Sequence, residues 1–177
     1  MKYKQISLIA LFALCALFGN SYGQDEKPAP SPTATFSQKV GLTEVTIVYS
    51  RPSKKGRTIM GELVPYGKVW RTGANATTKI TFSDDVKIDG KDLAAGTYAL
   101  FTIPGESEWT IMFSKDIKSG AGGYKESEDA VRVKVESIKI AETVETFLIN
   151  IEDNKPNSAI IELLWESTLV QIPLEVK

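Results

Sequence analysis

The chain has 177 residues, of which 24% are charged, and its formal net charge is −1 at pH 7. It contains no histidine, which excludes Ser–His and Cys–His nucleophile pairs, histidine-bound zinc or copper, and a histidine pH switch. The acidic balance argues against nucleic acid as a partner, because phosphate binding requires a basic face. Catalysis by this chain would have to depend on Lys, Arg, Asp, Glu, Tyr, Ser or Thr.

Residues 1–23 have the pattern of a signal peptide. Lys2 and Lys4 precede an apolar run over residues 6–18, and small residues predict cleavage between Gly23 and Gln24. The run is shorter than the roughly 20 residues of a membrane-spanning helix. The single cysteine also lies in this segment. We therefore expect a periplasmic or secreted mature protein that has no disulfide and no membrane span.

The rest of the chain reads as a short tether and one β domain. Residues 24–32, QDEKPAPSP, predict an extended proline-rich tether, and residues 33–177 are long enough for a single domain. From residue 33 on, polar and apolar residues alternate as in β-strands. The predicted strands begin near Thr33 and then cover residues 43–49, 78–82, 86–91 (a hairpin with an Asp-Gly turn), 96–103, 108–113, 131–135, 147–151, 159–165 and 169–176. This pattern predicts an all-β fold, an antiparallel β-sandwich or a jelly-roll-like domain.

The segment from Ser50 to Thr78, called the basic segment below, departs from this pattern. It holds six basic residues and one acidic residue, a net charge of +5. Glycines recur through it at short intervals together with a proline, which predicts a long irregular loop. Only Arg57–Val64 has apolar spacing that suits a short helical turn. Long loops on a rigid scaffold often carry binding residues, so we expect the recognition surface here.

Arginine holds a carboxylate or a phosphate with two parallel hydrogen bonds, so the arginines of the basic segment suggest a site for an anionic or carboxylate-bearing ligand. Our central hypothesis is a pocket formed by Arg57, Arg71 and Asn75, with an aromatic ring as its wall. The full set of predicted binding residues is Arg51, Arg57, Tyr66, Trp70, Arg71, Asn75 and Thr77. The alternative is structural, because the arginines could pair with the surplus acids of the scaffold. Lys54 and Lys55 have the pattern of a solvated loop tip.

Several motifs in and after the basic segment resemble one known family. They are residues 56–59 (GRTI), 61–67 (GELVPYG), 69–75 (VWRTGAN) and 101–105 (FTIPG). The run Trp-Arg-Thr-Gly-Ala-Asn resembles the signature of an exported bacterial family catalogued as domain of unknown function 2911, which is common in the Bacteroidetes. The resemblance extends over nearly the whole mature chain and implies a compact exported domain. It supplies no activity, substrate or catalytic residue.

Other motifs carry less weight. Four aspartates near the predicted hairpin (Asp84, Asp85, Asp89 and Asp92) match no calcium loop and suit turns. Trp109 and Trp165 are in phase with apolar neighbours, so we expect both in the core. The pattern allows Trp70 either a core position or an exposed position that stacks on a sugar.

We predict no catalytic residue, cofactor or metal site. The favoured function is a non-catalytic binding or interaction module, for a small anionic ligand or an envelope protein. The alternatives are a histidine-free enzyme acting on a polar or anionic envelope substrate, and a carbohydrate-binding module.

Overall fold

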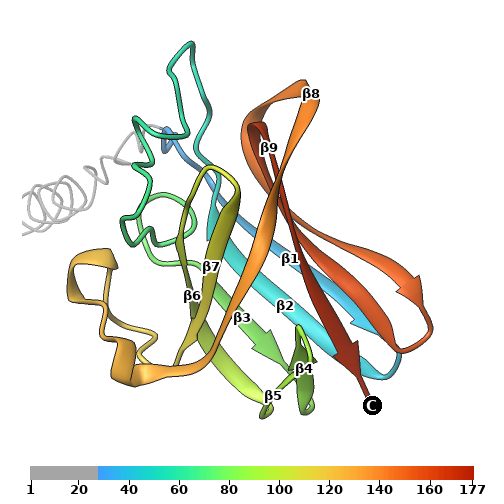
Figure 1. Cartoon of the computed structure of the whole chain (residues 1–177). Coiled ribbons are helices and arrows are strands. Elements are labelled where there is room, and N and C mark those ends of the chain that lie inside the picture. The colour runs from blue at the N-terminus through green and yellow to red at the C-terminus, as the bar shows by residue number, and fades with distance from the viewer. Residues whose placement is uncertain (1–27) are drawn as a thin grey trace, which may run out of the picture.

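A computed structural model describes residues 28–177, so the predicted signal peptide and the first residues of the tether lie outside the described part of the chain. The described chain forms one sheet of nine antiparallel strands in the order β1-β2-β3-β6-β7-β8-β9-β4-β5 (Figure 1). The predicted all-β antiparallel fold is confirmed. The strands are β1 Thr33–Val40, β2 Thr43–Ser50, β3 Lys79–Phe82, β4 Val86–Ile88, β5 Lys91–Leu93, β6 Gly96–Ile103, β7 Glu108–Ser114, β8 Asp129–Lys155 and β9 Ser158–Val176.

The sheet curls around one core because β8 belongs to both of its halves. Residues Asp129–Glu136 of β8 pair with β7, and residues from Ser137 onward pair with β9. The register between β8 and β9 shifts between Lys139 and Val144, where β8 bends. Figure 1 shows β8 and β9 crossing in front of β1 and β2. The concave face of the curled sheet therefore encloses most of the buried apolar side chains, and Ala99, Phe101 and Met112 form a second, small cluster.

Alternation along each strand explains which side chains fill the core. Val45, Ile47 and Tyr49 of β2 all point inward and are buried, and every second residue of β7 does the same. Trp109 and Trp165 are only 1% and 2% exposed, so the prediction that both belong to the core is confirmed. Each fully buried side chain of this size contributes about 1.5–3 kcal/mol relative to an exposed one.

In two places, two strands that the sequence pattern predicts as separate form one continuous strand. The predicted strands at residues 131–135 and 147–151 are both parts of β8, and those at 159–165 and 169–176 are both parts of β9. The prediction was wrong because the alternation of buried residues is interrupted at each bend, where the pairing of β8 with β9 shifts register. Glu166 in β9 has a φ of 54°, which marks such a break.

Local turns follow the sequence more closely. Asp89 and Gly90 have φ angles of 48° and 75°, and they join β4 to β5 as the predicted hairpin turn. Residues 57–64 form successive hydrogen-bonded turns rather than a helical turn. The short 3₁₀ turns lie instead at Ala121–Gly123 and Glu126–Glu128. Across residues 28–177, no helix is long and apolar enough to cross a membrane.

Candidate functional site

The basic segment is bonded to the sheet at both of its ends. At its start, Ser53 pairs with Thr146 of β8 in an isolated antiparallel bridge. At its end, Trp70 pairs with Thr102 of β6 in a second bridge, with N···O distances of 2.7 and 2.9 Å. This end of the segment continues along the edge of β6 beyond the point where β3 pairs with it. The turns between the two bridges are also held to the domain, because Ile59 and Val64 are buried in the core.

The last part of the segment, Trp70–Thr78, is called the anchored turn below. Thr72 is fully buried, and its carbonyl oxygen accepts a 2.6 Å hydrogen bond from the Thr78 hydroxyl. Gly73 has a φ of 153°, and a Cβ there would lie 3.1 Å from the Ser50 carbonyl oxygen, so only glycine fits. Asn75 donates from Nδ2 to the carbonyl oxygen of Ser31, 3.1 Å away. These two hydrogen bonds stabilise the turn and join it to Ser31.

Trp70 packs into the core from the anchored turn. Its ring stacks on Trp165 at 5.9 Å and meets Trp109 and Phe147 edge to face at 6.2 and 5.1 Å. Its indole N–H donates to the carbonyl oxygen of Gly73 at 3.1 Å. A sugar-stacking platform needs an exposed aromatic face, and Trp70 uses its faces in packing.

The three arginines of the segment do not converge. Arg51 Nε donates to the Phe147 carbonyl oxygen at 3.3 Å, and Arg57 donates to the carbonyl oxygens of Lys54 and Ser53 at 2.9 and 2.5 Å. Arg71 Nε is buried and has no hydrogen-bond partner within the described residues. None of the three forms an ion pair in the described part of the chain. For Arg51 and Arg57, backbone carbonyls therefore take the place of the scaffold acids that the structural alternative expected.

Lys54 is the residue of the segment that does form an ion pair. Its Nζ lies 2.5 Å from Oε1 of Glu166, and the two side chains are only 21% and 18% exposed. The expectation that Lys54 belongs to a solvated loop tip was wrong, although Lys55 is exposed. The partner of Lys54 lies 112 residues along the chain, so the local charge pattern carries no sign of it.

Glu166 holds the basic segment against the bend of β9. Its Oε2 accepts hydrogen bonds from the backbone N–H groups of Ile59 and Met60, each at 3.2 Å. Burial raises the pKa of the Glu166 carboxyl, but the hydrogen bonds from Lys54, Met60 and Ile59 outweigh burial and hold the pKa below its ordinary value. The φ of 54° at a non-glycine residue stores strain of a kind that often marks functional sites.

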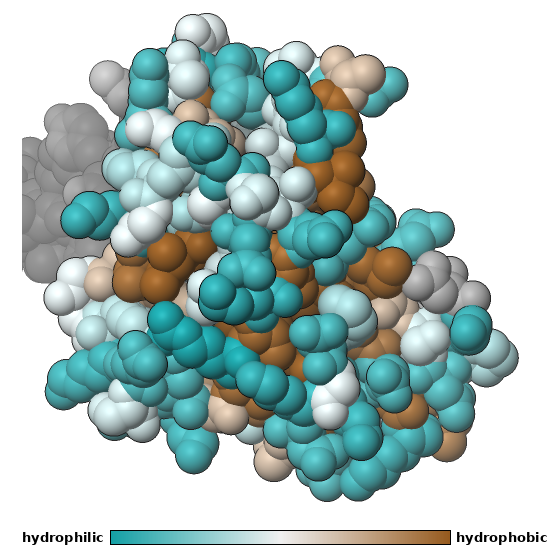
Figure 2. Space-filling view, in the orientation of Figure 1, coloured by the Kyte–Doolittle hydropathy of each residue, from teal (hydrophilic) through white to brown (hydrophobic). Residues whose placement is uncertain are grey.

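A cleft of about 390 Å³, called the polar cleft below, opens beside this ion pair. Its lining residues come from four parts of the chain: the basic segment, the turn between β6 and β7, the bend of β8 and the bend of β9. Figure 1 shows these four parts at one end of the molecule. Figure 2 shows hydrophobic surface over the bend of β8, close to teal hydrophilic surface. The lining residues are Lys54, Met60, Tyr66, Gly105, Glu106, Trp109, Ser137, Lys139, Thr143, Glu166, Ser167 and Thr168.

Trp109, which lines the polar cleft, carries an unsatisfied donor. The residue is 1% exposed, and its buried indole N–H has no acceptor in the described part of the chain. A buried donor without a partner costs about 1–3 kcal/mol, so such a group needs an explanation. Burial raises the pKa of the nearby Tyr66 phenol, and the charges of Glu106 and Glu166 raise it further, so both carboxylates act on the Tyr66 side of the cleft.

Of the predicted binding residues, only Tyr66 lines the polar cleft. The central hypothesis joined Arg57, Arg71 and Asn75, and none of these three borders the cleft. Thr77 instead donates to the carbonyl oxygen of Ser119 at 2.9 Å. The binding roles of these residues stay predictions. Sequence reasoning missed Lys54, Glu106, Trp109, Lys139 and Glu166, and the one available signal was the break in apolar alternation at Glu166-Ser167-Thr168.

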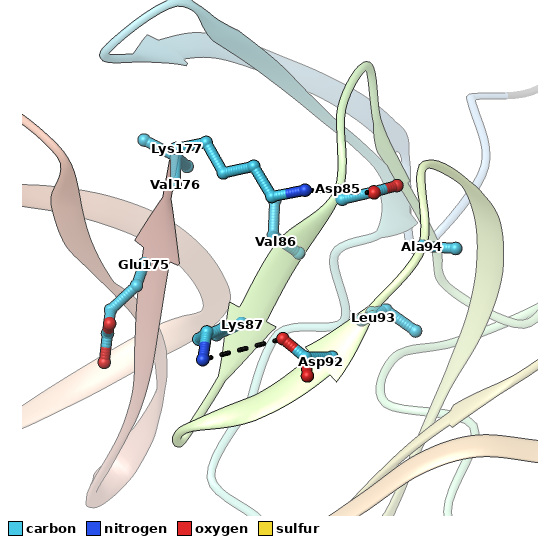
Figure 3. Close-up of a pocket in the computed structure, with 9 residues that line it drawn as sticks. All are labelled: Asp85, Val86, Lys87, Asp92, Leu93, Ala94, Glu175, Val176 and Lys177. Atoms are coloured by element: carbon cyan, nitrogen blue, oxygen red, sulfur yellow. Dashed lines mark hydrogen bonds and ion pairs between the residues drawn. The ribbon is translucent and has the colours of Figure 1, made fainter.

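A second cleft, of about 460 Å³, lies between the β4–β5 hairpin and the end of β9 (Figure 3). Its charged groups pair at the surface: Lys177 lies 3.2 Å from Asp85, and Lys87 lies 3.6 Å from Asp92. A hydrogen bond from the Ala95 N–H, aided by Lys177, holds the pKa of Asp85 below its ordinary value. No group of acidic, cysteine or histidine side chains in the described chain could hold a metal. The aspartates here act in turns and surface pairs.

Fold and site together define a class: an all-β antiparallel domain with a small polar cleft beside a long loop that is bonded to the sheet at both ends. The comparison with protein families agrees with the resemblance seen in the sequence. The chain belongs to the family described as "Protein of unknown function (DUF2911)", whose sequence model matches residues 31–174. Neither a curated protein nor a solved structure matches the chain.

Proposed function

We propose that this protein is a non-catalytic binding module that acts in the periplasm or outside the cell, and that its ligand site is the polar cleft beside the basic segment. The observation that carries the proposal is the buried, unpartnered indole N–H of Trp109 in the wall of that cleft. A ligand that brings an acceptor would satisfy this group, as ligands commonly do in clefts with a few well-placed polar groups.

The chemistry of the cleft favours binding over catalysis. A general acid or base needs a pKa near the working pH and a free position for the proton. The Glu166 carboxylate already accepts from Lys54, Ile59 and Met60, and its pKa is lowered rather than raised. The Lys54 ammonium is held by the same carboxylate. These groups are suited to fixing the shape of the cleft.

The ligand we propose is small, polar and anionic or carboxylate-bearing. A volume of about 390 Å³ lies at the lower end of the roughly 300–1,000 Å³ of ligand pockets. The exposed Lys139 ammonium lies in the wall, and the basic segment beside the cleft carries a net charge of +5. Both would attract an anion to the cleft.

One observation favours a carbohydrate as second candidate. Tyr66 is 39% exposed and lines the cleft, and a partly exposed aromatic ring can stack on a sugar. The hydroxyl groups of Ser137, Thr143, Ser167 and Thr168 line the same cleft and could bond sugar hydroxyls. A neutral glycan would bind in a manner largely independent of salt, whereas binding of an anion would weaken as salt screens the charges.

A thermal-shift screen of anionic metabolites, glycans and divalent cations tests the proposal. We expect a small acid to raise the melting temperature of the wild type, and Tyr66→Ala to abolish the shift. Arg57→Ala is the matched control, because Arg57 is exposed in the same segment but does not line the cleft. If Arg57→Ala abolishes the shift and Tyr66→Ala does not, the site is the arginine surface rather than the cleft.

Export is tested separately. The full chain with a C-terminal tag should be recovered from the periplasm or the medium of a bacterial host, and its intact mass should correspond to a chain that begins at Gln24. A cytoplasmic product that retains Met1 would contradict the proposed location.

A further inference from the structure

The charges of the polar cleft fall into two groups. Lys54 and Glu166 neutralise each other at 2.5 Å. Glu106 and Lys139 also line the cleft, and neither forms an ion pair with the side chains that the structure describes, those of residues 28–152 and 155–177. The cleft therefore presents one unpaired negative group and one unpaired positive group to whatever enters it.

The fold sets these two charges on different walls. Glu106 lies in the turn between β6 and β7, and Lys139 lies on β8 at its bend. The backbone hydrogen bond from Ser137 N–H to the carbonyl oxygen of Ser107, at 2.8 Å, ties the turn to the strand. Their backbone positions are thus fixed relative to each other, although both side chains are exposed. Unpaired surface charges alone would mark no site.

Trp109 supplies the independent observation. Its N–H has no acceptor in the described chain. The residue lines the same cleft and is only 1% exposed. A donor in this position calls for an acceptor group on the ligand. A carboxylate is the acceptor best suited to a wall that also carries a lysine, because charge-assisted hydrogen bonds are the stronger ones.

The Glu106 side of the cleft favours a cation. Tyr66 also lines the cleft, and the charges of Glu106 and Glu166 both act on its phenol. Glu166 is paired with Lys54, so Glu106 is the carboxylate left free to receive a positively charged group. An ammonium is the compact cation that donates three hydrogen bonds to such a carboxylate.

We infer that the polar cleft binds a small zwitterion, an amino acid or a short peptide, whose ammonium group contacts Glu106 and whose carboxylate contacts Lys139 and the indole N–H of Trp109. The inference rests on the proposed binding function and names the ligand class of the same cleft. Met60 and the Tyr66 ring would contact the apolar part of the ligand, since both line the cleft.

Isothermal titration calorimetry of the mature chain with matched ligands tests this assignment. The probes are free L-alanine, L-leucine and L-serine, and the dipeptides Ala-Ala, Leu-Leu and Ser-Ser in three forms: unmodified, N-acetylated and C-terminally amidated. We expect at least one unmodified probe to bind, and each blocked form of a binding dipeptide to bind about tenfold more weakly, as for loss of a charged hydrogen bond. Comparing the amino acids with the dipeptides tells which size the cleft accepts.

Variants assign each end of the ligand. Glu106→Gln should weaken binding of an unmodified dipeptide about tenfold but leave binding of the N-acetylated form unchanged. Lys139→Gln should weaken binding of the unmodified dipeptide about tenfold but leave binding of the C-terminally amidated form unchanged. Trp109→Phe removes the N–H while keeping an aromatic side chain, and it should weaken every form that retains a carboxylate. Glu62→Gln and Lys68→Gln are the controls, because both residues are exposed and neither lines the cleft. Melting temperatures verify that each variant is folded.

The outcomes separate this inference from the proposed function. Equal binding of blocked and unmodified dipeptides would overturn the zwitterion assignment. The zwitterion assignment would also be overturned if no amino acid or dipeptide binds while the thermal-shift screen finds another ligand whose effect is lost in Tyr66→Ala. The proposed function would then stand. If no compound of either kind binds, both fall.

Discussion

Two parts of the basic segment differ in how their aromatic side chains are placed. In the anchored turn, the Trp70 ring is packed between other aromatic rings, and its N–H donates to the Gly73 carbonyl oxygen. Beside the polar cleft, Tyr66 is 39% exposed. A single charged loop therefore combines a part that stabilises the fold with a part whose aromatic ring lies partly exposed at the cleft.

This difference also changes how the most distinctive run of the sequence is interpreted. Residues 70–77 are the densest group of polar and aromatic side chains in the segment, and a group of that kind suggested a binding surface. Their contacts show that Thr72 and Gly73 are buried within the fold. Residue types that suit ligand binding are the same ones that suit a crowded turn, and only partners in space tell the two apart.

The largest expected effect separates the two regions by stability. Trp70→Ala should lower the free energy of unfolding by about 3 kcal/mol, because it empties a site between three aromatic rings. Tyr66→Ala, at the exposed edge of the cleft, should cost less than about 1 kcal/mol. Urea titration of both variants checks the comparison. Equal losses would mean that the cleft side carries as much packing as the anchored turn.

Glycine substitutions sharpen the comparison within the segment. Gly73→Ala should cost about 2 kcal/mol more than Gly67→Ala. Both residues have positive φ angles, 153° and 69°, but a Cβ at Gly73 would crowd Ser50 and Thr78, whereas a Cβ at Gly67 would meet nothing within 4 Å. Thermal and urea unfolding measure the difference. Similar costs at the two positions would contradict the close approach assigned to the anchored turn.

The ion pair beside the cleft should have an intermediate effect. Glu166→Gln removes the charge that holds Lys54 and weakens two backbone hydrogen bonds, so we expect a loss of about 1.5 kcal/mol. The double variant with Lys54→Met completes a double-mutant cycle, and its coupling energy isolates the pair. Lys55→Ala, at an exposed neighbour, should change stability by less than about 0.5 kcal/mol. A coupling energy near zero would show that the pair does not hold the segment.

The pH dependence of the same residue gives the smallest effect. Because the folded-state pKa of Glu166 lies below the ordinary 4.5, its contribution to stability is present above that value and is lost as the pH falls through the folded-state pKa. The stability difference between wild type and Glu166→Gln should thus be constant from about pH 7 to pH 5 and shrink below about pH 4. Urea midpoints measured across this range provide the test. A difference that grows on acidification would mean that the pKa is raised instead.

Much of the fold follows from local pattern, and the cleft does not. Alternation predicted the strands around Ile47 and Ile111 and the core positions of Trp109 and Trp165, because strand periodicity is a property of neighbouring residues. The Asp89-Gly90 turn was predicted for the same reason. The joining of short strands into β8 and β9 was missed, since the register shifts there depend on the partner strand.

The polar cleft could not be predicted because its walls come from four distant parts of the chain. Lys54 and Glu166 are 112 residues apart in the chain. The sequence pattern correctly placed Trp109 in the core, but it gave no sign that the indole N–H would lack a partner. From the sequence alone, the arginines of the segment were grouped by their charge. In the structure, backbone carbonyl oxygens accept hydrogen bonds from the guanidinium groups of Arg51 and Arg57. A count of charges along the chain cannot show which acceptors lie closest.

The length of β8 has a consequence for where such a cleft can form. Its 27 residues would extend roughly 90 Å if straight, at about 3.3 Å per residue, whereas a domain of this size has a radius of gyration of only about 15 Å. A strand that long can stay within the domain only by turning sharply. The bend at residues 139–144 is thus a geometric requirement of one strand serving both halves of the sheet, and the polar cleft lies beside that bend. Substitutions elsewhere can alter what the cleft accepts without removing it.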